Sequence, residues 1–275
     1  MRRIARRIGK ALAIALVLIW SLAPIAMIVI SSFKMDRDIF TIPPKFIFSP
    51  TLSNYVGLWQ RWGDFFDALL NSLIITSAAT VLAVVSSVMA GYAYSRFRHP
   101  LLAGSAFFLV FIRLIPPIVI TLPLFPAVNT LGLNDTHLLL IILYATFFVS
   151  LGTLVMRTFI DQIPRELDEA AHIDGATRSQ ILRRVIFPLS AQGMVAVAVF
   201  VIVFSWNEFL FAFIFTTTQA KTAPLVLAEM YDSVEGVEWG VLFAASTLQL
   251  IPVLIFVIAA QKYLVAGLTA GATKG

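Results

Sequence analysis

Long apolar segments that carry almost no charge constrain this chain more than any other feature of its sequence. In chain order they cover residues 11–33, 68–95, 101–126, 136–156, 189–216 and 239–261. A helix needs about 20 predominantly apolar residues to cross the hydrocarbon core of a bilayer. Hydrophobic residues make up 59% of the chain, whereas about 45–50% is usual in soluble domains. The sequence therefore predicts an all-α, polytopic membrane protein with six transmembrane helices.

The first apolar segment could be a retained span or the core of a cleaved leader. Its 23 residues exceed the roughly 7–15 apolar residues of a leader core. We therefore expect a retained first span, which follows a short basic N-terminus over residues 1–10.

The second predicted span places a small residue at every fourth position, at Ala79, Ala83, Ser87 and Gly91. Such a row lets another helix approach closely. The neighbour could be a helix of this chain or a helix of a partner protein.

The third predicted span is expected to be irregular. Its prolines are Pro116, Pro117, Pro123 and Pro126. Proline frees carbonyls from the helical ladder, and such backbone is tolerated in a membrane mainly where protein or a wet cavity covers it. This span should therefore not face lipid throughout.

The distribution of basic residues predicts the orientation. Lys and Arg number five in the N-terminus, two after the second span, five over 157–184 and two in the tail. On the other side there are four in the loop 34–67, none in the second loop and one in the loop 217–238. The positive-inside rule then places both termini in the cytoplasm. The calculated pI of 9.7 is explained by topology, so no nucleic-acid partner is needed.

One polar stretch stands out between the fourth and fifth spans, at residues 164–188. Pro164 suits the start of a helix, and the acidic residues that follow complement the helix dipole. Gly175 then interrupts the pattern, and helical spacing resumes from Thr177 to Val185. We expect two short helices joined by a bend. Leu167, Ala170, Ala171 and Ile173 would give the first helix a small apolar face that another protein could receive in a groove.

This stretch also resembles a known motif. Glu169-Ala170-Ala171, Asp174-Gly175-Ala176 and Ile186-Phe187-Pro188-Leu189 are similar to the EAA loop of ABC importer permeases, in the carbohydrate-uptake branch that includes the maltose permease pair. The tail, Gly267-Leu268-Thr269-Ala270-Gly271-Ala272 followed by Lys274-Gly275, is similar to the C-terminus of the smaller permease of that pair. The resemblance covers essentially the whole chain.

The resemblance implies a permease subunit of a bacterial ATP-driven importer in the cytoplasmic (inner) membrane. It would move a sugar, polyol or related carbohydrate by alternating access. Its implied partners are a second, non-identical permease, two cytoplasmic ATPase subunits that bind ATP and Mg²⁺, and an extracytoplasmic solute-binding protein. The transmembrane domain would span 11–263, with a cytoplasmic coupling loop at 161–188 and a cytoplasmic tail at 264–275.

The resemblance also assigns roles within the loop. Glu169 would face a basic residue of the ATPase, while Ala170 and Ala171 would permit close contact. Asp174 and Gly175 would shape the bend. The tail from Gly267 would also reach the ATPase interface.

No catalytic motif is present in the sequence. There is no phosphate-binding loop, zinc-protease pair or nucleophile elbow. The absence of cysteine excludes a thiolate metal site, and the three histidines are scattered singly, so we expect no metal site and no cofactor bound by this chain. The alternatives are an ABC permease for another class of solute and an ion-coupled secondary transporter, which also needs broken helices and intramembrane charge. A membrane-embedded enzyme would require a motif that this chain lacks.

Arg113 and Glu208 are the ionisable residues that fall within predicted spans. Intramembrane charges face cavities or partners because exposing them to lipid is costly. For Arg113, a structural pairing and a position lining the substrate pathway are both open. Asn207 and Glu208, which interrupt the fifth span, are predicted to lie near the external half of a polar pathway.

Overall fold

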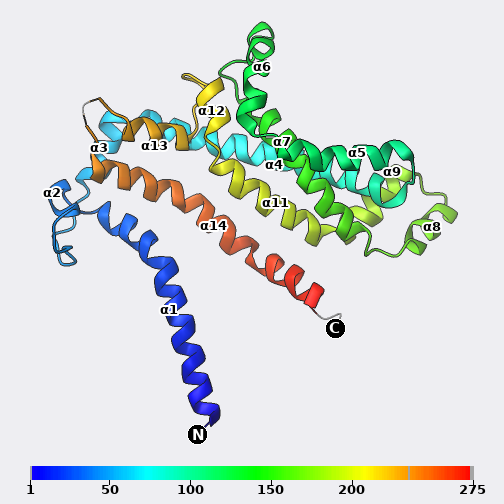
Figure 1. The fold of residues 1–275 in the computed structure, drawn as a ribbon, viewed down its shortest axis with the longest axis horizontal. Helices are drawn as coiled ribbons and strands as arrows, with labels where there is room; N and C mark the ends of the chain where they lie inside the picture. The colour runs from blue at the N-terminus through cyan, green and yellow to red at the C-terminus, as the bar shows by residue number, and fades with distance from the viewer. Residues whose placement is uncertain (1, 235, 273–275) are drawn as a thin grey trace. The chain divides into compact units, whose positions relative to one another are not determined.

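The computed structural model describes the backbone of residues 2–234 and 236–272, and the side chains of residues 6–234 and 236–261. All regular elements in this part of the chain are helices, and it contains no strand (Figure 1). In chain order they are α1 (Arg2–Ser31), α2 (Asp36–Ile39), α3 (Ser53–Arg61), α4 (Asp64–Arg96), α5 (Pro100–Phe111), the 3₁₀ turn η1 (Ile112–Leu114), α6 (Pro117–Thr130), α7 (His137–Ile160), α8 (Glu166–Ile173), α9 (Arg178–Ile181), the π-turn η2 (Leu182–Ile186), α10 (Phe187–Leu189), α11 (Ala191–Trp206), α12 (Leu210–Phe215), α13 (Ala223–Tyr231) and α14 (Trp239–Ala272). The predicted all-α class is confirmed.

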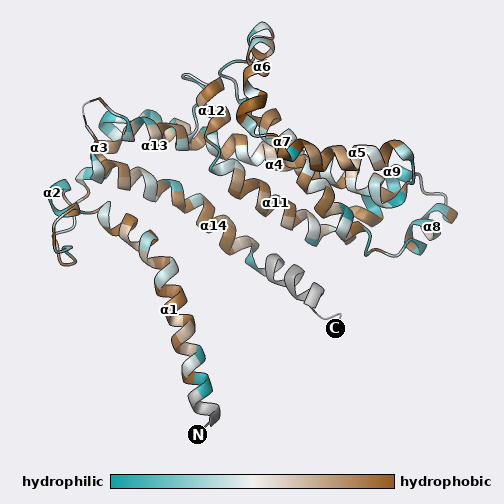
Figure 2. Cartoon of the chain, viewed as in Figure 1, coloured by the Kyte–Doolittle hydropathy of each residue, from teal (hydrophilic) through white to brown (hydrophobic). Residues whose placement is uncertain are grey.

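Four of the described helices are long and apolar enough to cross a membrane, and the number rises to six if each of two bent pairs counts as one span. The four are α1, α4, α7 and α14, which match the first, second, fourth and sixth predicted spans. Figure 2 shows hydrophobic residues along much of α6 and α11, and hydrophilic residues over α8 and α9.

The first bent pair is the predicted third span. Helix α5 with η1 meets α6 at an angle of 99°. The break falls at Ile115 and Pro116, directly before Pro117 opens α6. Because Pro116 and Pro117 cannot donate backbone hydrogen bonds, the helical ladder has no continuation there. The predicted irregularity of this span is confirmed.

The chain divides into two units. The first comprises the described residues up to Asp67 together with Val226–Pro252. Within it the Asn54 side-chain amide donates to the carbonyls of Ser32 and Lys34 at 2.8 and 2.7 Å, and the Asp36 carboxylate accepts from the Gly240 N–H at 2.8 Å. These bonds fix the turn that follows α1 beside the start of α14.

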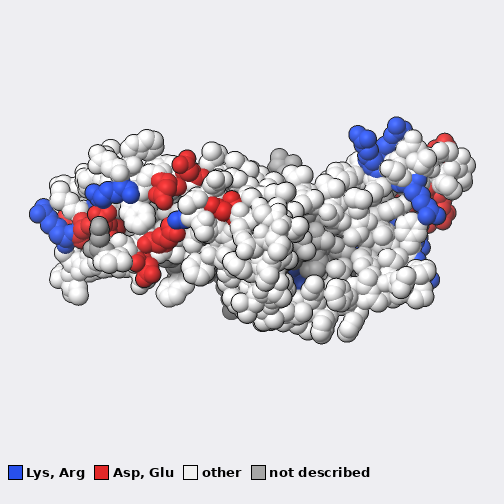
Figure 3. Space-filling model, turned by 90° about the horizontal axis from the view of Figure 1, so that it is seen from above, with Lys and Arg blue, Asp and Glu red and all other residues white. Residues whose placement is uncertain are grey.

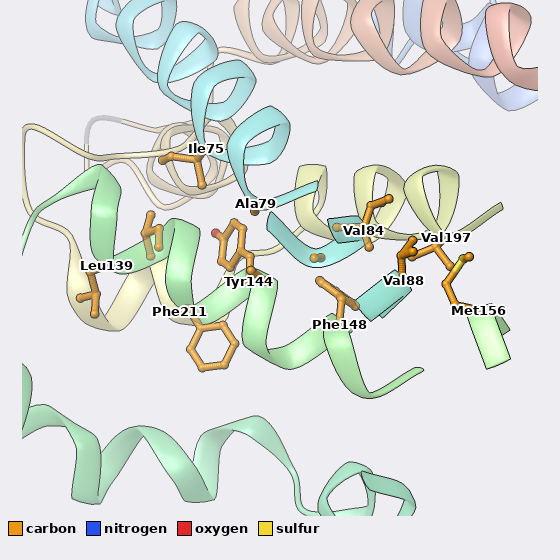
Figure 4. Close-up of a cluster of buried hydrophobic side chains, with 14 of the residues drawn as sticks. Ile75, Ala79, Val84, Val88, Leu139, Tyr144, Phe148, Met156, Val197 and Phe211 are labelled. Carbon is orange, nitrogen blue, oxygen red and sulfur yellow. The ribbon is translucent and has the colours of Figure 1, made fainter. Parts of the chain in front are cut away.

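The second unit comprises Ala68–Leu225 and the described residues from Val253 onward. Its core is built from α4, α7, α11 and α12, whose buried side chains meet in Figure 4. Tyr144 and Phe211 lie side by side there, with ring centroids 6.3 Å apart. Leu140, Met156 and Val201 are fully buried.

The row of small residues on α4 packs within this chain. Ala79, Ala83 and Ser87 have no exposed surface. A Cβ atom added to Gly91 would lie 2.8 Å from the Cβ of Met156 and 2.9 Å from the backbone nitrogen of Arg157. Of the two alternatives for this row, packing against a helix of the same chain is therefore confirmed, and that helix is α7.

Candidate functional site

The polar stretch folds as two short helical pieces joined by a bend, as predicted. Pro164 lies just before the first piece, where its carbonyl accepts the Leu167 N–H at 3.3 Å, and α8 itself begins at Glu166, two residues later than predicted. Glu166, Asp168 and Glu169 occupy the first turn of α8, where their negative charge complements the helix dipole. Gly175 ends this piece with a φ of +83°, a left-handed conformation that glycine adopts without a steric penalty.

The second piece starts with a capping box. Thr177 accepts the Gln180 N–H at 3.4 Å through its hydroxyl, and the Gln180 side chain accepts the Thr177 N–H at 2.8 Å. A π-turn then covers Leu182–Ile186, where the sequence predicted continued α-helical spacing. Pro188 cannot donate to the carbonyl one turn earlier, so the regular ladder could not have continued through it.

The predicted coupling residues are presented to the surface. Glu169, Ala170, Asp174 and Gly175 are exposed, whereas Ala171 is half-buried and packs against the core. Leu167 and Ile173 leave 43% and 86% of their surface exposed. The apolar face predicted for α8 is therefore divided, with Ala171 turned to the protein and Leu167 and Ile173 uncovered. Figure 3 shows acidic and basic side chains gathered over the end of this unit that carries α8 and α9, beside a wide uncharged surface.

A network that the sequence did not reveal joins this loop to the end of α4. The guanidinium of Arg96 donates to the Asp168 carboxylate at 2.6 Å and to the carbonyls of Ile163 and Ile160 at 2.9 and 3.3 Å. The hydroxyl of Ser95 donates to the Asp161 carboxylate at 2.6 Å. The network links positions more than sixty residues apart, so no local sequence signal could have found it.

The residues predicted for the pathway do not come together as one cluster. The Arg113 guanidinium lies 5.4 Å from the centre of the Phe147 ring and 3.5 Å from the carbonyl of the same residue. Glu208 caps α12 by accepting the Phe211 N–H at 2.9 Å, and Asn207 is exposed. Among the ion pairs found between described residues, none joins Arg113 to Glu208.

A second unforeseen feature is a carboxylate clamp at the turn between α6 and α7. Asp135 has a φ of 57° and accepts the backbone N–H groups of four consecutive residues, 217–220, at 2.9–3.1 Å. The hydroxyls of Thr217 and Thr218 add bonds of 3.0 and 2.7 Å. Burial raises the pKa of the Asp135 carboxyl, but the hydrogen bonds from Gln219, Ala220, Thr218 and Thr217 outweigh it and hold the pKa well below its ordinary value.

Two further predictions concern metal ions and the tail. The described residues contain no group of three or more His, Cys, Asp or Glu residues that could hold a metal ion. The side chains of the tail motif, including Gly267 to Ala272, and all of Lys274 and Gly275 lie outside the described residues.

Comparisons with known proteins identify what this chain is similar to. The family described as binding-protein-dependent transport system inner membrane component matches residues 83–270, which include the whole polar loop. The chain is 41% identical to the trehalose transport system permease protein SugB of Mycobacterium tuberculosis over 82% of each chain. It is 36% identical to the trehalose/maltose transport system permease protein MalG of Thermococcus litoralis, over 99% of this chain and 98% of the relative.

A solved structure supports the fold. A chain of a bacterial ABC transporter involved in the import of the acidic polysaccharide alginate matches with a TM-score of 0.79. The match covers 94% of this chain and 96% of the other at 22% identity. At this identity the likeness concerns the fold alone.

Proposed function

Because this chain belongs to the family of binding-protein-dependent transport system inner membrane components, we propose that the solute it imports is a sugar, a polyol or a related carbohydrate. The chain is a multi-pass inner-membrane permease subunit of an ABC importer, and it is not the ATPase subunit. The family membership predicted from the resemblance of the polar loop is thereby confirmed. Support for a carbohydrate comes from the two relatives above, which are named for trehalose and for trehalose and maltose.

Such a permease acts in a complex with a binding protein and ATPases. The finer composition is our proposal: a second, non-identical permease, two cytoplasmic ATPase subunits that hold ATP and Mg²⁺, and an extracytoplasmic solute-binding protein. Both termini would lie in the cytoplasm, because the basic residues gather on that side. The transmembrane domain would cover 11–263, with residues 1–10 and 264–275 as its cytoplasmic ends.

The loop 161–188 is proposed as the surface that couples ATP hydrolysis to transport. The observation that carries this proposal is the exposure of α8, which presents the Glu169 carboxylate together with the uncovered side chains of Leu167 and Ile173. An amphipathic helix of this kind docks in a groove of another protein. Glu169 would meet a basic residue of the ATPase, Ala170 and Ala171 would allow close approach, and Asp174 and Gly175 would set the bend.

For the pathway, we propose that Asn207 and Glu208 lie near the external half of a polar route. Two observations support this: α11 ends at Trp206, and the exposed Asn207 amide bonds back to the Val203 carbonyl at 2.8 Å. Arg113 stays a candidate for the same route, since its guanidinium is half-buried against Phe147.

The coupling proposal is tested by Glu169→Lys in the complete complex reconstituted in vesicles. We expect the variant chain to insert normally, and we expect ATP hydrolysis to continue with little or no uptake. Uptake of trehalose or maltose by the wild type should require ATP and stop with vanadate. An ion-coupled transporter would instead work without the ATPase.

Asp232→Lys is the matched control, because it makes the same charge change at an exposed position of the loop 217–238. Its uptake should equal that of the wild type. Normal uptake by Glu169→Lys would refute the role of α8. ATP-dependent uptake of a solute other than a carbohydrate would refute the proposed substrate class while leaving the coupling role intact.

A further inference from the structure

The contacts of Arg96 join the last residue of α4 to the proposed coupling helix. Its Nε donates to the Asp168 carboxylate at 2.6 Å, and its two terminal nitrogens reach the carbonyls of Ile160 and Ile163 at 3.3 and 2.9 Å. One planar side chain therefore contacts the last residue of α7, the turn that follows it and the first turn of α8. Only arginine presents donors in this fixed fork.

Burial distinguishes this ion pair from an ordinary surface pair. The side chains of Arg96 and Asp168 expose 7% and 15% of their surface. By contrast, Arg157 and Asp161 lie 3.6 Å apart with 46% and 47% exposed, and a pair of that kind contributes little to stability. Removing one partner of the buried pair would leave the other charge without compensation.

A second set of bonds reinforces the same connection. The hydroxyl of Ser95 donates to the Asp161 carboxylate at 2.6 Å, and the Arg165 guanidinium donates to the Ser95 carbonyl at 2.8 Å. Residues 95 and 96 are thus bonded to five positions between Ile160 and Asp168. This connection is independent of the covalent links that α8 has to α7 and to the segment leading into α11.

We propose that Arg96 and Asp168 are positioning residues that transmit displacement of α8 directly to α4. The inference rests on the proposed coupling role of α8. Because α4 packs closely on α7 through Gly91 and Ser87, a movement delivered to the end of α4 is shared with α7. Without the pair, α8 would act on the spans mainly through its covalent connections to α7 and α9, and part of its displacement would not reach α4.

The decisive quantity is the number of solute molecules imported per ATP hydrolysed. It is measured with the complete complex in vesicles, using trehalose or maltose as the probe. The variants are Arg96→Lys and Asp168→Asn, each alone and combined. Lysine keeps the positive charge but cannot reach Asp168 and both carbonyls at once. Arg61→Gln is the control, because it removes an exposed ion pair, with Glu238, that involves neither α8 nor the end of α4.

We expect Arg96→Lys and Asp168→Asn to lower uptake per ATP by several fold while the ATPase stays bound to the complex. The double variant should be no worse than the more impaired single variant, because both changes break one connection. Arg61→Gln should match the wild type.

Two results would overturn the inference. Uptake per ATP equal to that of the wild type in both single variants would show that the pair carries no motion. A lower abundance or a loss of bound ATPase, with an unchanged ratio in the complexes that remain, would show a structural role only. If the wild type itself shows no ATP-dependent uptake, the proposed function fails and this inference fails with it.

Discussion

At the scale of single residues, the surroundings of each carboxylate assign it a different task. Asp135 is saturated with hydrogen bonds from the loop 217–220, and Asp168 is half-buried against Arg96. Glu169, the next residue along, is exposed. A carboxylate that lies inside the fold cannot meet a partner protein, so the exposed acidic residues of α8, Glu166 and Glu169, are the ones available for an intermolecular contact.

The Asp135 clamp leads to a prediction about stability and pH. In Asp135→Asn the neutral amide oxygen accepts weaker hydrogen bonds, and the amide NH₂ group faces backbone N–H groups that are themselves donors. The loop 217–220 should therefore be held less tightly. We expect a loss of about 1 kcal/mol and a fall in apparent Tm of about 2–4 °C at neutral pH. The measurement is thermal unfolding of the detergent-solubilised protein, with exposed Asp232→Asn as the control.

The sign of the pH dependence follows from the lowered pKa of Asp135. The stabilisation is complete above the ordinary carboxyl pKa of about 4, and it is lost as the pH falls through the lower pKa of the folded state. The difference between wild type and Asp135→Asn should therefore be constant near neutral pH and shrink below about pH 4. A difference that grew on acidification would contradict the clamp.

A further residue-scale prediction concerns the break after α11. Asn207→Ala and Glu208→Ala, tested separately, should lower uptake more than the amount of chain found in the membrane. The reason is that Asn207 is exposed, and polar groups of this kind within a span are usually kept for a pathway. Uptake assays and quantitative immunoblots of the same membranes provide the measurement, and equal losses in both would favour a structural role.

At the scale of the helix, the contact between α4 and α7 depends on the absence of side chains. Gly91→Val would force a branched side chain against Met156 and the backbone of Arg157. We expect a loss of about 1–3 kcal/mol from overpacking, together with a lower yield of folded protein by size-exclusion chromatography. Gly104→Ala is the control, because nothing lies within 4 Å of the added Cβ atom. Equal behaviour of the two variants would contradict the close packing.

Local signals predicted the elements well, and contacts between distant residues could not be predicted. The apolar segments predicted the long helices α1, α4, α7 and α14, Pro116 and Pro117 marked the break in the third span, and Gly175 marked the bend in the polar loop. The fifth predicted span, 189–216, is divided between α11 and α12, and the second bent pair covers Arg178–Leu189 and Ala191–Trp206. Helix α13 was missed because the charged residues of 217–238 suggested only an external loop. Arg96 and Asp168 are 72 positions apart in the sequence, and Asp135 is 82–85 positions from the residues that it binds. The periodicity of a single sequence carries no information about such distant pairs.

At the scale of the whole molecule, the two hydrogen-bonded networks, one around Asp135 and one around Ser95 and Arg96, lie at opposite ends of the apolar helix α7. Asp135 precedes α7, and the residues bonded to Ser95 and Arg96 begin where α7 ends. Between them α7 is almost entirely apolar. Such an arrangement suits a helix that crosses a bilayer, because charged groups are tolerated at its ends and are costly at its centre.

The orientation of the chain can be tested cleanly because it contains no cysteine. Ser179 in α9 and Ser49 in the loop 34–67 are both exposed, and cysteine is close to serine in size. Ser179→Cys should react with a membrane-impermeant maleimide only after the inner membrane is opened, whereas Ser49→Cys should react in intact spheroplasts. We expect this pattern because basic residues gather in the polar loop and are scarce in the loops of the other side, which places the polar loop in the cytoplasm.

Each variant serves as the control for the other, since both place one exposed thiol in an otherwise unreactive chain. Reversed labelling would put α8 outside the cell, where no ATP is available, and would remove the basis for coupling by Glu169 and for transmission by Arg96. Labelling of both thiols in intact spheroplasts would place both loops on the same side, which requires an even number of crossings between residues 49 and 179. The expected pattern, by contrast, requires an odd number of crossings between residues 49 and 179, which α4, the bent third span and α7 together supply.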